Sequence, residues 1–174
     1  MLIRPERTAD HDAVRAVHRT AFAPVAPEPG AEPTEVSLVD RLRADGDLVE
    51  ACCVVAERDG EVVGHVAVSR GRLDGERRLL ALGPIGVAPR VQREGVGAAL
   101  MHAAIGAAEA LGEKGIVLLG HPDYYPRFGF APAVEWGVRP PQDWGPAYFL
   151  LRRLTAWPAG GMSGTFGCAP TFGV

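Results

Sequence analysis

Two glycines, two positions apart in the loop Gln92-Arg93-Glu94-Gly95-Val96-Gly97, mark the segment of this sequence best suited to chemistry. The loop lies between a strand-like run and a helix-like run. Backbone N–H groups in the first turn of a helix have no internal partners, and the helix dipole favours an anion there. Glycines also let a pyrophosphate approach the backbone closely. The loop therefore predicts a phosphate site, and a plain structural turn is the equally supported alternative.

Two common nucleotide-binding loops do not fit this segment. No Lys-Ser or Lys-Thr pair follows the glycines, which excludes a Walker-type loop. The three-glycine fingerprint of dinucleotide-binding folds is also absent, and the strands before the loop are joined by hairpins. A nucleotide-binding protein is therefore a third hypothesis, which predicts binding of ATP or NAD.

The segments before the loop are expected to form helices first and antiparallel strands afterwards. Thr8 and Asp10 are both candidate N-caps of the first helix. The pairs Asp59-Gly60 and Asp74-Gly75 are typical of tight hairpin turns between strands. The predicted elements are a strand, two helices and three strands, over 2–5, 8–22, 35–43, 52–57, 62–68 and 79–87.

The segments after the loop are expected to complete a single domain over residues 1–174. The prediction is a helix, a buried strand, at most a short helix, two short strands around a turn, and an extended tail, over 95–111, 115–119, 122–128, 133–154 and 155–174. This order predicts an α/β (α+β) fold, with a mixed, mostly antiparallel central sheet flanked by helices. Edge strands of the terminal hairpin could pair two subunits into a homodimer.

Composition excludes several classes of partner. A net charge of −3 with scattered basic residues gives no electrostatic case for nucleic acid. No apolar run reaches the roughly 18 to 20 residues of a membrane helix, so we expect a cytoplasmic protein with no membrane partner. Cys52, Cys53 and Cys168 are expected to be small core residues rather than disulfide or metal ligands, and no metal is expected.

Two stretches of the chain resemble the motifs of one family. Leu82 to Leu100 contains Gln92-x-x-Gly95-x-Gly97, which is similar to the acyl-coenzyme A signature of the GNAT acetyltransferase superfamily. Gly120-His121-Pro122-Asp123-Tyr124-Tyr125-Pro126-Arg127-Phe128-Gly129-Phe130 resembles the superfamily's tyrosine and Gly-Phe element, in wording closest to the bacterial YhbS-like branch. The two motifs occur in the right order, and the expected order of elements extends the resemblance over most of the chain.

The resemblance implies acetyl-CoA as cosubstrate and a set of backbone contacts to it. In such enzymes the glycine loop holds the pyrophosphate through its amides, and the strand before it bonds the pantetheine arm. The matching positions are Ile85, Gly86, Val87, Gln92, Arg93, Glu94, Gly95, Val96, Gly97 and Ala98.

The resemblance also assigns an acid and leaves the base open. Tyr125 matches the tyrosine that protonates the departing thiolate, and a packed aromatic is its alternative role. Many relatives carry a glutamate on the strand before the loop, but here no carboxylate occurs between residues 76 and 94. His121 is the best-placed base, against the alternatives of a plain surface or core histidine. Glu50, His65 and ordered water are further candidates.

The function implied is N-acetylation of a primary amine, on a small molecule or a protein, by direct attack on the thioester in a ternary complex. A non-catalytic acyl-CoA-binding sensor or scaffold is the alternative, which the missing strand carboxylate favours and Tyr125 opposes. The acceptor site is expected from the loop at 24–33, the helix after it and the region 133–148. Three glutamates near that loop weakly favour a cationic amine.

Overall fold

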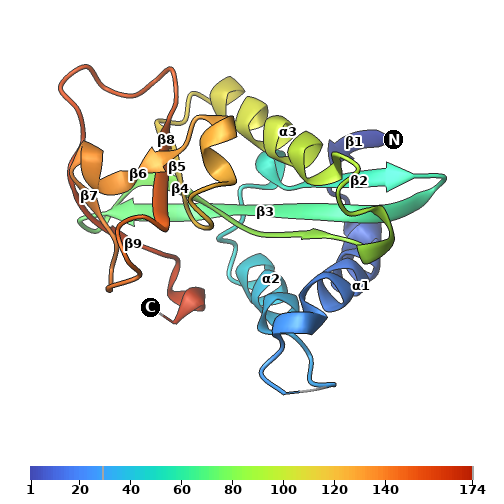
Figure 1. The fold of residues 1–174 in the computed structure, drawn as a ribbon. Coiled ribbons are helices and arrows are strands. Elements are labelled where there is room, and N and C mark those ends of the chain that lie inside the picture. Colours follow the sequence, from blue (N-terminus) through green and yellow to red (C-terminus); the bar gives the residue numbers. More distant parts are fainter. Residues whose placement is uncertain (29, 174) are drawn as a thin grey trace. The chain divides into compact units, whose positions relative to one another are not determined.

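A computed structural model describes residues 1–28 and 30–173, and only the backbone at 77 and 78. Pro29, within the predicted acceptor loop, and Val174, at the end of the predicted tail, lie outside the described residues. The chain forms two compact units: Met1–Val68 with Pro84–Ala104, and Ser69–Gly83 with Ile105–Val174 (Figure 1). Among the described residues, no helix is both long enough and apolar enough to cross a membrane.

The order of elements confirms the predicted fold class, a mixed and mostly antiparallel sheet with helices. The helices are α1 (His11–Phe22), α2 (Thr34–Ala44) and α3 (Val96–Ala110). The strands are β1 (Leu2–Pro5), β2 (Val54–Arg58), β3 (Glu61–Leu73), β4 (Glu76–Val87), β5 (Gly115–Leu119), β6 (Ala131–Pro132), β7 (Val138–Arg139), β8 (Phe149–Arg153) and β9 (Gly164–Gly167). β3, β4 and α3 continue from one unit into the other.

Both predicted Asp-Gly turns are confirmed. Asp59-Gly60 has φ values of 53° and 81°, and Asp74-Gly75 has 48° and 85°. Left-handed backbone at both central positions gives the type I′ turn, whose twist matches that of the flanking strands. β2 and β3 pair antiparallel from Val54 opposite Val66, and β1 pairs antiparallel with β2.

In the first unit, helices cover both faces of these strands. α1 and α2 lie on one face and α3 on the other (Figure 1). Val14 of α1 and Val39 of α2 pack with Val55 and Ala67 of the strands in one buried cluster. Helical spacing of apolar residues therefore predicted both helices and the faces they bury.

Asp10 occupies the N-cap position of α1, one of the two positions predicted, but its side chain makes no cap hydrogen bond on that helix. Its carboxylate instead accepts hydrogen bonds from Arg4 at 2.7 and 2.9 Å and from the Arg7 backbone N–H at 2.7 Å. A charged, bidentate partner binds a carboxylate more strongly than the free amides of a helix end, so the ion pair prevails.

The predicted terminal hairpin is also wrong. β7 pairs parallel with β9, and β8 lies between β5 and β6. The cause is burial of the tail: Phe166 of β9 is 1% exposed and packs against Phe149, with ring centroids 5.8 Å apart. Because β8 has partners on both sides, the hairpin-edge argument for a homodimer falls away.

We expect Phe166→Ala to lower the free energy of unfolding by about 3–5 kcal/mol, because it empties a buried site in the core of the second unit. Gly71 has no side chain where this ring lies: a Cβ there would be 2.2 Å from it. Urea titration of the variant checks the loss. Phe172→Ala, at a half-buried position in the same tail, is the matched control and should cost far less. Equal losses would contradict the role given to β9.

Candidate active site

The predicted phosphate loop is an exposed backbone turn that leads into α3. Gln92 to Gly95 are exposed, and Val96 is buried. Gly95 has φ +85°, and a Cβ added there would meet nothing within 4 Å, so its glycine is required by backbone conformation rather than by space. The first helical hydrogen bond runs from Ala99 N–H to the Gly95 carbonyl, at 3.0 Å. The N–H groups of 96–98 therefore precede the helical hydrogen bonds, as an anion site requires.

Side chains of the loop fasten it to neighbouring strands. Gln92 Nε2 donates a hydrogen bond to the Val87 carbonyl, 3.0 Å away at the end of β4. Glu94 forms an ion pair with Arg58 at 2.6 Å, at the end of β2. Since both side chains are directed at the strands, the backbone amides are the groups that the loop offers to a ligand.

The strand segment before the loop is closely covered by α1. Gly86 is buried, and a Cβ at this position would lie 2.9 Å from His18 Nδ1 and 3.5 Å from the Cβ of Ala21. Any larger residue would push α1 away from β4. Ile85 and Val87 on either side are half-buried.

Tyr125 is held by packing in the second unit. Its ring lies against Gly120, where a Cβ would be only 2.2 Å from it, and it contacts the rings of Tyr124 and Phe130 at 5.1 and 6.0 Å between centroids. Burial, followed by the neighbouring Tyr124, raises the pKa of Tyr125. The ring is therefore a packed aromatic, and its hydroxyl group stays protonated and can donate a hydrogen bond or a proton.

His121 lies on the surface, on the loop that follows β5. Its side chain is 67% exposed, and Nδ1 is 3.6 Å from Asp123 Oδ2. The ring meets Tyr148 edge to face at 6.4 Å. It borders an open, mostly apolar cavity of about 360 Å³. This cavity is lined by Leu119, Gly120, His121, Trp144 and Tyr148.

The predicted site residues fall into two groups. Ile85–Val87 and Gln92–Ala98 belong to the first unit, where Gln92 joins the strand to the loop. His121 and Tyr125 belong to the second unit, on one connection after β5.

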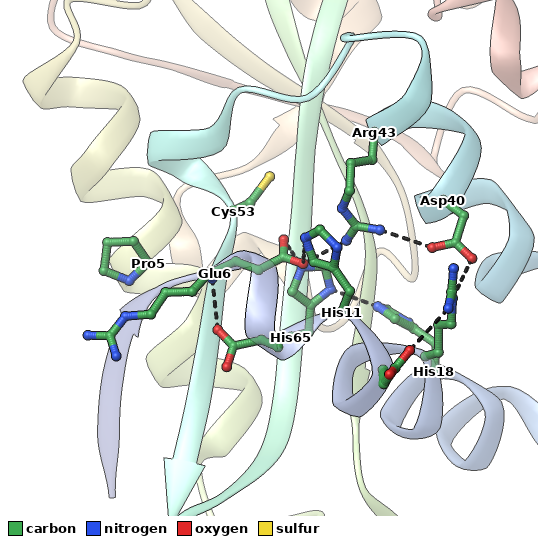
Figure 2. A network of polar contacts seen from close by, with 12 residues as sticks. Pro5, Glu6, His11, His18, Asp40, Arg43, Cys53 and His65 are labelled. Atoms are coloured by element: carbon green, nitrogen blue, oxygen red, sulfur yellow. Dashed lines mark hydrogen bonds and ion pairs between the residues drawn. The ribbon is translucent and has the colours of Figure 1, made fainter.

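His65, a candidate base from the sequence, belongs to a buried polar chain in the first unit that sequence reasoning missed (Figure 2). Nε2 of His18 lies 2.8 Å from Nδ1 of His65, and both rings are fully buried. Nε2 of His65 lies 3.2 Å from the Glu6 carboxylate. The other carboxylate oxygen of Glu6 pairs with Arg43 at 2.6 Å and lies 3.8 Å from His11.

A signal for this chain was present in the sequence. His18 recurs with the apolar residues of α1, and His65 lies inside the apolar run 62–68. A histidine at a core position needs a buried hydrogen-bond partner, so each ring implied a polar contact. Nothing local pointed to Glu6, which is 59 positions from His65. Glu50, another candidate base, is exposed and joins a different feature, a cavity of about 460 Å³ that it shares with Glu6, His11 and Arg43.

The electrostatics of the chain keep His18 neutral and Glu6 charged. Burial, and then the charge of His65, lowers the pKa of His18 to about 3. Burial acts to raise the pKa of Glu6, but its hydrogen bond to His65 and the charges of His65 and Arg43 lower it overall. Near neutral pH the chain therefore holds one carboxylate and an uncharged inner imidazole.

The cysteines are not placed for nucleophilic chemistry. Cys52 and Cys53 are buried as predicted, and burial raises the pKa of Cys53 to about 12. A thiol with so high a pKa is a poor nucleophile near neutral pH. Within residues 1–28 and 30–173, no group of three or more His, Cys, Asp or Glu side chains could hold a metal ion.

Stability is expected to fall as the pH drops from about 6.5 towards about 3. His18 has a folded-state pKa of about 3 and an ordinary value of 6.5, so in this window the unfolded chain binds a proton that the folded chain refuses. The contribution is complete above pH 6.5 and is lost below it, by at most about 1.4 kcal/mol per pH unit. Urea titrations across the window measure the slope. His18→Gln should flatten it, and an unchanged slope would contradict this assignment.

The sequence of this chain is similar to one family model and to two bacterial proteins. Residues 50–132 match a family model described as an acetyltransferase (GNAT) domain. The uncharacterized N-acetyltransferase YjhQ of Escherichia coli K12 is 33% identical over 131 residues, which cover 71% of this chain and 72% of that protein. The uncharacterized N-acetyltransferase YhbS of Escherichia coli is 29% identical over 165 residues, covering 94% and 93%.

Two solved structures are similar over nearly the whole chain. The crystal structure of Escherichia coli YhbS in complex with CoA has a TM-score of 0.88 at 28% identity, covering 99% of this chain and 92% of that one. A GNAT family acetyltransferase from Brucella melitensis, in complex with acetyl-CoA, has a TM-score of 0.80 at 34% identity, covering 98% and 97%.

Proposed function

Because this chain belongs to the GNAT family of N-acetyltransferases, we propose that it transfers the acetyl group of acetyl-CoA to a primary amine of a small molecule or a protein. The observation that carries the proposal is the exposed glycine loop, whose amides precede the first helical hydrogen bond of α3. Similar proteins at 28% and 34% identity hold CoA or acetyl-CoA in their crystals. The cytoplasm remains the predicted location.

Backbone groups of the first unit would bind the donor. The amides of Gln92 to Ala98 would hold the pyrophosphate, and the edge of Ile85–Val87 would bond the pantetheine arm. The N–H near Val87 would stabilise the oxyanion. Direct attack by the amine in a ternary complex then needs positioning and oxyanion stabilisation above all.

Gly97→Val is expected to raise the Kd for acetyl-CoA about tenfold or more, a loss of about 1.4 kcal/mol, because it places a branched side chain where the pyrophosphate approaches. Isothermal calorimetry with acetyl-CoA checks the affinity. Gly106→Val is the matched control: the same substitution on the same helix, at an exposed position with nothing within 4 Å of its Cβ. Its Kd should stay within about twofold of the wild type. Equal weakening by both would argue against the loop.

Tyr125 would supply the proton that the sulfur of CoA takes up as the C–S bond breaks. A thiolate is costly in a buried environment, and a phenol with a raised pKa is protonated when the charge develops. Its packing against Gly120 fixes the ring for this role.

Tyr125→Phe is expected to bind acetyl-CoA normally and to lower kcat about 100-fold, because it removes one hydroxyl and leaves the packed ring. Release of the CoA thiol during turnover measures kcat, and calorimetry measures affinity. Tyr124→Phe, next along the chain, is the control and should remain near wild type. Turnover unaffected by Tyr125→Phe would remove this tyrosine from the mechanism.

His121 would contact the acceptor amine at the apolar cavity that this histidine borders. An exposed imidazole can take a proton from an ammonium group directly or through water, so His121 is proposed as the base for the incoming amine. The glutamates near the loop at 24–33 weakly favoured a cationic acceptor. Glu32 is paired with Arg19 at 2.7 Å, so its charge is already compensated and this argument is weakened. A panel of spermidine, tyramine, kanamycin and an alanyl dipeptide tests the acceptor class.

The alternative is a module that binds acyl-CoA without turnover. The observation in its favour is that the strand before the loop has no carboxylate between residues 76 and 94. Binding of acetyl-CoA with no acetylation of any amine in the panel would support this alternative over the enzyme.

A further inference from the structure

The cavity beside His121 gathers large apolar side chains that are exposed. Leu119, the last residue of β5, is 54% exposed, whereas residues 115–118 of the same strand are buried. Tyr148 is 47% exposed and Trp144 is half-buried. Exposed apolar residues scattered singly need no explanation, but these three line one cavity of about 360 Å³. Their grouping indicates a site for a ligand with an apolar body.

The walls of this cavity are fixed by packing within the second unit. The ring of Trp144 packs against the buried Phe149, with centroids 5.7 Å apart. The ring of Tyr148 covers Gly145, where a Cβ would lie 3.3 Å from it. The Gly120 N–H donates a hydrogen bond to the Tyr148 carbonyl at 2.9 Å, which ties the end of β5 to the start of β8. Such a cavity is already formed, so a ligand orders few side chains on binding.

The cavity adjoins both groups proposed to move protons. His121, the proposed base, is part of its wall. Gly120 is part of the same wall, and the ring of Tyr125, the proposed acid, packs against this glycine. An apolar body held in the cavity therefore brings an attached amine close to the connection that carries the acid and the base.

The electrostatics of the cavity disfavour a polycation. Its lining residues include no carboxylate. Asp123 lies 3.6 Å from the His121 ring, but its side chain is 89% exposed and does not line the cavity. Spermidine and kanamycin carry several ammonium groups, and each would lose water here without gaining an anionic partner. The acceptor that fits has one amine and an otherwise uncharged body.

The size and the rings of the cavity narrow the class further. Ligand sites commonly measure about 300–1,000 Å³, and about 360 Å³ is at the small end of this range. Trp144, Tyr148 and His121 present three rings to the space. Aromatic rings in offset or edge-to-face contact gain energy beyond the area that they bury. An aromatic body therefore suits these walls better than an aliphatic body of the same size.

We infer that the acceptor is an arylalkylamine, a primary amine joined by a short alkyl chain to an aromatic ring that lies against Leu119, Trp144 and Tyr148. This inference rests on the proposed acetyl transfer. The amine nitrogen forms the amide C–N bond and loses a proton to His121. The C–S bond of acetyl-CoA breaks, and Tyr125 gives a proton to the sulfur. The products are an N-acetyl arylalkylamine and the CoA thiol.

Within the acceptor panel, tyramine should have a kcat/KM about tenfold or more above those of spermidine, kanamycin and the alanyl dipeptide, because only tyramine places a ring in the cavity. Release of the CoA thiol measures each rate. A higher kcat/KM for any of the other three amines overturns the inference.

Leu119→Glu places a carboxylate in the cavity at a side chain that is already exposed, so β5 keeps its backbone pairing. It should raise the KM for tyramine about tenfold or more and leave kcat within about twofold, because the ring is bound equally before and during reaction. Leu111→Glu is the matched control: the same substitution just after α3, at a leucine that is 49% exposed and does not line the cavity. An unchanged KM in Leu119→Glu, or an equal rise in both variants, overturns the inference.

A second variant separates an aromatic site from a merely apolar one. Tyr148→Leu keeps the cavity apolar and removes one ring. Wild type should prefer phenethylamine over cyclohexylethylamine, which has the same carbon skeleton, by about threefold or more in kcat/KM. Tyr148→Leu should reduce this preference. A preference that is absent in wild type, or unchanged in the variant, overturns the aromatic assignment.

Binding can also be measured without turnover. NMR titration of the full chain with tyramine, alone and with CoA present, follows the indole N–H of each tryptophan. The signal of Trp144 should move, and Leu119→Glu should abolish the movement. Trp136 and Trp157 line a different cavity and serve as internal controls. A Trp144 signal that stays fixed in both titrations overturns the inference.

The two levels of proposal fail differently. If Trp144 responds to tyramine but no amine is acetylated, acetyl transfer is contradicted, and the arylalkylamine site stands as a binding site. If another amine is acetylated and Trp144 does not respond to tyramine, the transferase stands and the arylalkylamine site falls.

Discussion

Close approach of helices to both faces of the first unit's strands is the constraint on which the rest depends. A Cβ on Gly64 of β3 would lie 3.0 Å from Leu100 and Val96 of α3, and a Cβ on Gly86 of β4 would lie 2.9 Å from His18 of α1. Each glycine therefore sets how near one helix can come. The first contact fixes the start of α3 and its loop, and the second brings an imidazole against the strand.

Most of the fold could be predicted from the sequence, because the local sequence signals agree with one another. Helical spacing predicted α1 and α2, and Asp-Gly pairs predicted both turns, since only left-handed backbone suits these hairpins. The end of the chain was misread for a physical reason. β7 and β9 have two and four residues, too few for a periodic pattern, and their pairing follows from burial of Phe166 far along the chain.

The candidate site could be predicted from the sequence only where backbone groups, rather than side chains, would bind the ligand. A glycine loop before a helix is a local feature, so its residues could be named from the sequence. The polar chain of Glu6, His65 and His18 is assembled from the residue after β1, from β3 and from α1. Each histidine resembles a core residue when it is read by itself. The two contacts of this polar chain join positions that are 47 and 59 residues apart in the sequence, so no local pattern could reveal it.

The carboxylate of Glu6 also links parts of the first unit that share no backbone pairing. It contacts His65 of β3 and Arg43 of α2, and Arg43 in turn bonds Asp40, which bonds Arg15 of α1. Its partners bring compensating charge, so the carboxylate remains ionised despite its burial. Loss of one member would leave another unpaired, which makes the group cooperative in its effect.

The pairing of β9 with β7 has a consequence for synthesis on the ribosome. Every residue of the first unit has been made once residue 104 is complete, whereas the core of the second unit waits for Phe166, 62 positions later. The first unit can therefore fold while the core of the second is still incomplete.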